Sequence, residues 1–233
     1  LGNTCYMNTT IQCLVHTIPL TKLFTNNNYK KHLNDKSKNR IFALQWDNLV
    51  NHVWTPKEGI SSLCPKNFVR LNELISKKMY QENKLSSAFI VGQQHDMAEY
   101  LQFVLDILHD SISCHVIMNS EGNIKTRLDK LMVDSYSNFC THFQKDYSCI
   151  IDLFAGQYFT QIVTCDAIAT SEHSESFDPF TILTACIPPR LKTCTIYNCL
   201  DIMISDEIIE GWKGETSKTP RTIKKNLYFK KKK

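Results

Sequence analysis

Apolar residues recur at helical spacing in three stretches of the first half of the chain. In residues 5–18 they fall at i, i+4, i+7, i+8 and i+11, a stripe that consists of Met7, Ile11, Leu14, Val15 and Ile18. Pro19 is expected to end this helix. Residues 41–54 and 92–110 show similar spacing, and the last of these helices is expected to begin near Gly92.

The pattern changes in the last third of the chain. Strand signals begin at Ile150. Over residues 158–165 successive side chains alternate between two faces, the even-numbered residues on one face and the odd-numbered residues on the other, as in a β-strand. The stretch before Ile150 is polar and less periodic, with some helix. These patterns predict an α+β protein in three parts: a helical subdomain at residues 1–115, a connector at 116–145 and a β-rich region at 146–233.

Cys5 follows a Gly-Asn-Thr turn and stands in the first turn of the first predicted helix. Unpaired backbone N–H groups and the positive end of the helix dipole lie at that position, and both favour the thiolate, the nucleophilic form of cysteine. A free cysteine is in general more often a small buried hydrophobe. The turn before Cys5 and the helix after it favour the nucleophile instead.

Residues 1–14 resemble the Cys box of the ubiquitin-specific proteases, which reads roughly G-L-x-N-L-G-N-T-C-[YF]-M-N-S-x-[LI]-Q-C-L. The match holds at nearly every fixed position, with Thr9 in place of the usual serine. The resemblance implies a papain-like cysteine protease fold, with a helical thumb followed by β-rich fingers and palm. It also implies that Cys5 attacks the carbonyl after the C-terminal glycine of ubiquitin, with the Cys5 backbone N–H as an oxyanion donor.

Two carboxylates, Asp96 and Glu99, lie three residues apart near the start of the third predicted helix, away from its apolar stripe. Acids near a helix N-terminus complement the dipole, which by itself explains the pair. The stretch also resembles the family element Q-Q-D-A-x-E-F-L-x-x-L-L-D-x-L-H, whose acids at these positions bind the arginines in the tail of ubiquitin. Paired carboxylates suit that task because they accept guanidinium groups bidentately. We expect His95 not to be the catalytic base, and His52 and His109 to be structural.

Composition describes an ordinary globular protein of 233 residues, 42% hydrophobic and 21% charged. Its ten cysteines are scattered, and no secretory signal opens the chain. A reducing compartment, the cytoplasm or the nucleus, is therefore expected. No run of about 18 apolar residues occurs, so no membrane span is expected.

Basic residues concentrate at the end of the chain. Residues 218–233 contain eight Lys or Arg and no acid, which leaves 19 basic and 23 acidic groups in residues 1–217. The run at 230–233 is compatible with nucleic-acid contact or a nuclear address. A solvated end, or a place where the chain was cut, explains it equally well, so nucleic acid is disfavoured. The family resemblance implies ubiquitin or ubiquitinated proteins as the partners.

Zinc ligation is the first point at which the chain departs from the family pattern. The family often carries two C-x-x-C pairs in the fingers, a tetrahedral zinc site. Here Cys165 is present, but Ile168 stands where the second cysteine of its pair would fall. One thiolate cannot hold structural zinc, so neither a metal nor another cofactor is expected.

The catalytic base is the second departure. A cysteine protease needs a histidine base and an Asp or Asn to orient it, and the family takes the histidine from a downstream G-H-Y motif. None of the eight histidines stands in such a motif. The resemblance covers roughly the first two-thirds of the catalytic domain, so the fold is expected to be incomplete on its C-terminal side. Because the chain opens at Leu1 without a Met, we expect a segment of a longer enzyme; a catalytically inactive ubiquitin-binding module is the alternative. A thiol redox protein is disfavoured because no C-x-x-C pair occurs.

Overall fold

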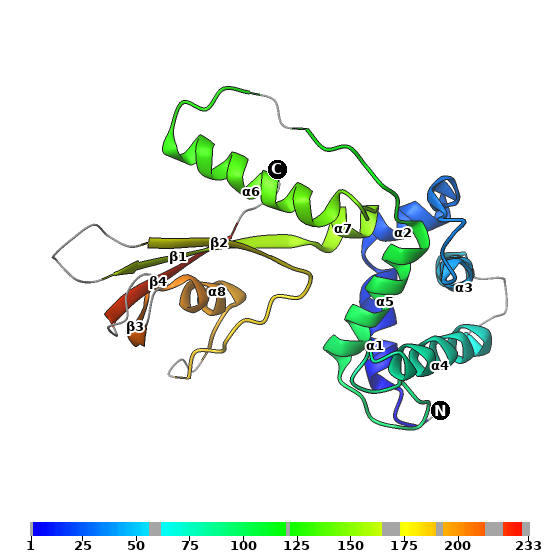
Figure 1. Ribbon diagram of the computed structural model, residues 1–233. Helices are drawn as coiled ribbons and strands as arrows, with labels where there is room; N and C mark the ends of the chain where they lie inside the picture. Colours follow the sequence, from blue (N-terminus) through cyan, green and yellow to red (C-terminus); the bar gives the residue numbers. More distant parts are fainter. Residues whose placement is uncertain are drawn as a thin grey trace. The chain divides into compact units, whose positions relative to one another are not determined.

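The computed structural model describes residues 2–55, 62–119, 122–164, 173–189, 193–212 and 221–229, which form two compact units. Unit 1 comprises Leu1–Ile117 and Phe143–Leu153, and unit 2 comprises Met118–His142 and Phe154–Lys233. Unit 1 is helical, whereas unit 2 combines a β-sheet with helices (Figure 1). The mixed content confirms the predicted α+β class.

Unit 1 contains the helices that the apolar periodicity predicted, together with α4, which has 16 residues, and several shorter ones. Its elements are α1 (Cys5–Val15), α2 (Ile18–Thr25), the 3-10 helix η1 (Asn28–His32), α3 (Arg40–Trp54), α4 (Lys66–Gln81), α5 (Met97–Ile112) and α7 (Cys149–Phe154), which reaches the boundary with unit 2. Helices α1 and α5 run side by side through this unit (Figure 1). An antiparallel bridge between Cys114 and Tyr147 joins the end of α5 to the segment before α7.

The core of unit 1 is built mainly from aromatic side chains. The largest fully buried ones are Trp46, Tyr29, Tyr100, Phe24, Phe42, Phe68, Phe89, Phe103, Met7, Leu14, Leu20 and Ile107. Helix α5 contributes an almost continuous buried face, because its apolar residues recur at spacings of three and four. Helices α1 and α3 supply the facing side chains.

The expectation that Pro19 ends the first helix is wrong. Helix α1 stops at Val15, and Pro19 lies in the first turn of α2. Proline is tolerated there because the N–H groups of the first turn have no intrahelical acceptor. Ile18, which was assigned to the α1 stripe, belongs to α2 and is 49% exposed.

Unit 2 is organised around a four-stranded antiparallel sheet in the order β2-β1-β4-β3. The strands are β1 (Gly156–Thr164), β2 (His173–Phe180), β3 (Glu207–Trp212) and β4 (Arg221–Phe229). Helix α6 (Arg127–Phe143) is linked to β1 through Gln157, which accepts a hydrogen bond from Ser135 at 2.6 Å and donates one to Asn138 at 2.8 Å. Helix α8 (Ile196–Ile204) precedes β3 and packs against β4.

The prediction that strand structure begins at Ile150 is also wrong. Residues from Cys149 to Phe154 form helix α7, and the first strand begins at Gly156. A short apolar run fits a helix or a strand equally well by periodicity. The predicted connector at 116–145 contains helix α6, a helix of 17 residues.

Candidate active site around Cys5

Cys5 is the first residue of α1, and its side chain is exposed. The turn before it depends on Asn3, whose backbone is in the left-handed region with φ of 55°. Asparagine adopts this conformation more readily than other non-glycine residues. The Asn3 side chain donates a hydrogen bond from Nδ2 to the carbonyl oxygen of Gly92 at 2.9 Å. This contact ties the turn before Cys5 to the loop that leads into α5.

Helix α5 begins at Met97, not near Gly92 as expected, because Asp96 is its N-cap. The Asp96 Oδ1 atom accepts a hydrogen bond from the backbone N–H of Glu99 at 2.9 Å. The Glu99 carboxylate in turn accepts one from Ser86 Oγ at 3.1 Å. Both acids remain exposed, so each keeps oxygen lone pairs that face solvent.

An aromatic cluster holds the start of α1 against the start of α5. The Tyr6 ring lies 5.1 Å from those of His95 and Tyr100 and 6.1 Å from that of Phe89, centroid to centroid. Tyr6 directly follows Cys5, and His95 directly precedes Asp96. The structure thus brings the two predicted segments together, although nothing in the local sequence pattern of either one indicates the other.

The arrangement combines an exposed thiol at one helix N-terminus with two exposed carboxylates at the start of a neighbouring helix. The thiol is a nucleophile of the kind that forms covalent acyl intermediates. The carboxylates can accept hydrogen bonds from a cationic peptide. Such a surface suits covalent chemistry on a substrate whose approaching tail is basic.

Three histidines of unit 1 make hydrogen-bond contacts within the fold. Nε2 of His95 accepts a hydrogen bond from the backbone N–H of Ile90 at 3.1 Å, so this nitrogen is not free to take a proton from a thiol. His109 contacts Ser148 Oγ through Nδ1 at 2.8 Å, and His52 bonds to a carbonyl of its own helix. Each of these three histidines thus has at least one ring nitrogen engaged within unit 1.

Two further cysteines of unit 1 help to distinguish Cys5. Cys13 is also exposed and lies on α1, but in the last turn of the helix, away from its N-terminus. Burial raises the pKa of the Cys149 thiol to about 11, so its thiolate is scarce near neutral pH. Cys13 is therefore the suitable control for Cys5.

Among the described residues, no group of three or more His, Cys, Asp or Glu side chains is placed to bind a metal ion. Cys165 and Ile168, on which the zinc prediction depends, lie outside the described residues, as does the basic run at 230–233. No described helix is long and apolar enough to cross a membrane.

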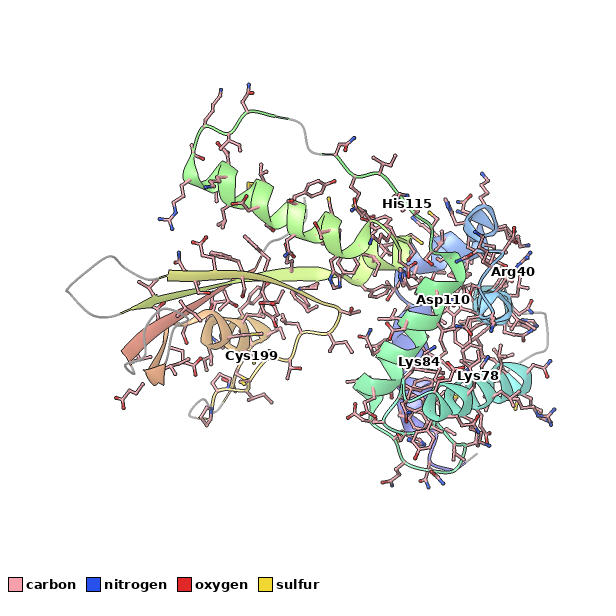
Figure 2. The ribbon with its side chains drawn as sticks, in the orientation of Figure 1. Arg40, Lys78, Lys84, Asp110, His115 and Cys199 are labelled. Carbon is pink, nitrogen blue, oxygen red and sulfur yellow. The ribbon has the colours of Figure 1, made fainter. Side chains whose placement is uncertain are left out.

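A hollow of about 720 Å³ lies elsewhere in unit 1, between the segment that leads into α3 and the helices α4 and α5. Lys78, Lys84 and Asp110 line it, and Figure 2 labels all three. Neither Cys5 nor the acids at the start of α5 contribute to it. The candidate site is therefore a surface site at the helix N-termini, separate from this hollow.

Known proteins resemble the chain over nearly its whole length. Residues 1–225 match the family model described as "Ubiquitin carboxyl-terminal hydrolase". Ubiquitin carboxyl-terminal hydrolase 4 of Vanderwaltozyma polyspora is 30% identical over 242 aligned positions, which cover 97% of this chain and 26% of the relative. Human ubiquitin carboxyl-terminal hydrolase 15 is 30% identical over 208 positions, which cover 84% of this chain and 19% of the relative. The chain thus spans about a quarter of such relatives or less.

Solved structures agree on the fold. The Ubp8/Sgf11/Sus1/Sgf73 deubiquitinating module of SAGA bound to ubiquitin aldehyde matches with a TM-score of 0.62 at 19% identity, over 98% of this chain and 43% of that chain. A variant of the same module, bound to monoubiquitin, gives a TM-score of 0.61 at 18% identity. The predicted papain-like fold is thereby confirmed. The family match and these relatives together show that the chain belongs to the ubiquitin carboxyl-terminal hydrolases, as a ubiquitin-specific protease.

Proposed function

We propose that the protein to which this chain belongs hydrolyses the peptide or isopeptide bond after the C-terminal glycine of ubiquitin, with Cys5 as the nucleophile. The observation that carries the proposal is the placement of an exposed thiol at the N-terminus of α1, tied through Asn3 to the loop before the acidic start of α5. The family match and the ubiquitin-bound structural neighbours support ubiquitin as the partner.

The acids at the start of α5 hold the substrate in this proposal. Asp96 and Glu99 accept hydrogen bonds from the arginines of the ubiquitin tail and direct that tail toward Cys5. Cys5 attacks the carbonyl carbon, the C–N bond breaks, and the amine leaves with the thiol proton as the thioester forms; water then hydrolyses the thioester and releases the carboxylate and the Cys5 thiol. The Cys5 backbone N–H donates to the oxyanion. The reducing cytoplasm or nucleus is the proposed compartment, since the described cysteines are free thiols.

The second candidate function is a catalytically inactive module that binds ubiquitin. Two observations favour it: the sequence contains no G-H-Y motif, and Nε2 of His95 and Nδ1 of His109 are engaged in structural contacts. Binding requires the acids at the start of α5 but not the thiol. The two candidates therefore differ in the role of Cys5 alone.

The nucleophile is tested with ubiquitin that carries an electrophile at its C-terminus, mixed with this chain and analysed by intact mass. We expect one covalent adduct, which disappears in Cys5→Ala and persists in Cys13→Ala, an exposed cysteine of the same helix. An adduct that survives Cys5→Ala would contradict the assignment of the nucleophile. Saturable ubiquitin binding without an adduct would support the inactive module.

The tail-binding role of Asp96 must be separated from its role as a helix cap. Asparagine caps a helix as well as aspartate does, so Asp96→Asn removes the charge and keeps α5 intact. We expect Asp96→Asn and Glu99→Gln each to weaken ubiquitin binding by about tenfold or more, because hydrogen bonds to charged groups contribute about 1.5–3 kcal/mol. Glu210→Gln, an exposed acid on β3, is the control with the same charge change. Equal binding by Asp96→Asn and the control would refute the proposed role.

A further inference from the structure

Three cysteines of unit 2 gather at the start of helix α8. Cys194 and Cys186 are both close enough to Cys199 to interact with it electrostatically. Cys199, labelled in Figure 2, lies on α8 itself. These thiols are far along the sequence from Cys5 and play no part in the proposed hydrolysis.

Local helix geometry explains why Cys194 and Cys199 meet. Thr195 is the N-cap of α8 and forms a reciprocal capping box with Asn198. The backbone N–H of Thr195 donates to Asn198 Oδ1 at 2.9 Å, and that of Asn198 donates to Thr195 Oγ1 at 3.4 Å. Cys194 therefore precedes the cap by one residue and Cys199 is the fourth residue of the helix. Side chains at these two positions pack against each other in a hydrophobic staple.

The two thiols differ in their access to solvent. Cys194 is exposed, whereas Cys199 is 6% exposed. Burial, followed by the neighbouring thiol of Cys194, raises the pKa of Cys199. An exposed thiol with a second, buried thiol nearby has the arrangement of an oxidisable cysteine beside its resolving partner.

We propose that Cys194 and Cys199 are a peroxide-oxidisable thiol pair that closes a disulfide across the first turn of α8. Hydrogen peroxide oxidises the exposed Cys194 thiolate to sulfenic acid and is itself reduced to water. The Cys199 sulfur then attacks the sulfenic sulfur, an S–S bond forms, and the hydroxyl group leaves as a second water with the Cys199 proton. The capping box places the two cysteines on either side of the first turn of α8, at the positions whose side chains meet in a hydrophobic staple.

The test treats the whole chain with a small excess of hydrogen peroxide at neutral pH, blocks the remaining thiols and maps the products by mass spectrometry. Cleavage after Tyr197 separates the two cysteines, so a disulfide appears as two peptides held together and released by dithiothreitol. We expect the chain to lose two hydrogen atoms and the pair to form before Cys64, an exposed cysteine of unit 1, is oxidised. A disulfide between Cys194 and Cys186 would overturn the proposal. So would a Cys194 that is still a free thiol after Cys64 has been oxidised.

Variants at the pair test the order of steps and the geometry. Cys199→Ser should leave Cys194 as a sulfenic acid that a dimedone probe traps, since the resolving thiol is absent. Thr195→Ala removes the side-chain cap and should slow closure by about fivefold, as expected for the loss of about 1 kcal/mol of cap energy. Thr195→Ser keeps the hydroxyl group and should close at the rate of the parent chain. Equal rates in Thr195→Ala and Thr195→Ser would show that the capping box does not position the pair.

Discussion

The two units of this protein bury different kinds of side chain. The twelve largest fully buried side chains of the described residues all lie in unit 1, and eight of them are aromatic. Among the described residues of unit 2, the buried side chains are mostly small or polar, including Ser135, Cys140, Gln157, Thr160 and Cys199. Unit 1 is therefore stabilised mainly by apolar burial, and unit 2 by its hydrogen-bonded sheet and polar contacts.

Both units also expose large apolar side chains. Helix α8 and strand β3 of unit 2 expose a group of large apolar side chains: Ile196, Tyr197, Ile202, Ile204 and Ile208. The proposed catalytic surface lies in unit 1, where the aromatic cluster around Tyr6 supports both Cys5 and Asp96. A nucleophile needs a fixed position, and a close-packed aromatic core supplies it.

The largest effect is expected from truncation in the core of unit 1. Trp46→Ala should lower the free energy of unfolding by about 3–5 kcal/mol, because Trp46 is fully buried and contacts Phe24 and Phe68. Ile208→Ala, at a position of unit 2 that is 69% exposed, should change it by less than about 0.5 kcal/mol. Urea unfolding followed by circular dichroism measures both. Losses of similar size would contradict the difference between the units.

A smaller effect is expected from a buried hydrogen bond of unit 1. Tyr100 Oη donates to Asn72 Oδ1 at 2.7 Å, so Tyr100→Phe leaves a buried acceptor without its donor and should cost about 1–3 kcal/mol. Tyr6 is the matched control, since its buried hydroxyl has no hydrogen-bond partner among the described residues. Tyr6→Phe should be neutral or stabilising in the same urea titration. A larger loss in Tyr6→Phe than in Tyr100→Phe would refute this reading of the core.

The smallest effect is expected at the polar contact between α6 and β1 in unit 2. Ser135→Ala removes the 2.6 Å hydrogen bond to Gln157 Oε1 and should cost about 1 kcal/mol. Thr141→Ala removes a hydroxyl of α6 that bonds only to its own helix at Ser137, and should cost less than about 0.5 kcal/mol. Hydrogen exchange of the β1 amides compares the two variants. Equal protection of β1 in both would mean that Ser135 does not anchor the helix.

Several features of the fold were predictable because they depend on residues close in sequence. Apolar periodicity identified α1, α3 and α5, and alternation identified β1. The start of α5 was misplaced although a signal was present: an acid three residues before a glutamate, Asp96 and Glu99, is a capping pattern. Pro19 and Ile150 were misassigned because a proline fits a first helical turn and a short apolar run fits two structures.

The sequence by itself determined the family, the helix that carries Cys5 and the two carboxylates near the start of α5. These are local patterns, set by spacing and turn chemistry. Only the tertiary structure decided that these segments meet, through a hydrogen bond between Asn3 and Gly92 that spans 89 positions. It also decided the strand order β2-β1-β4-β3, because the choice of a distant partner depends on how complementary surfaces pack and local pattern does not encode it.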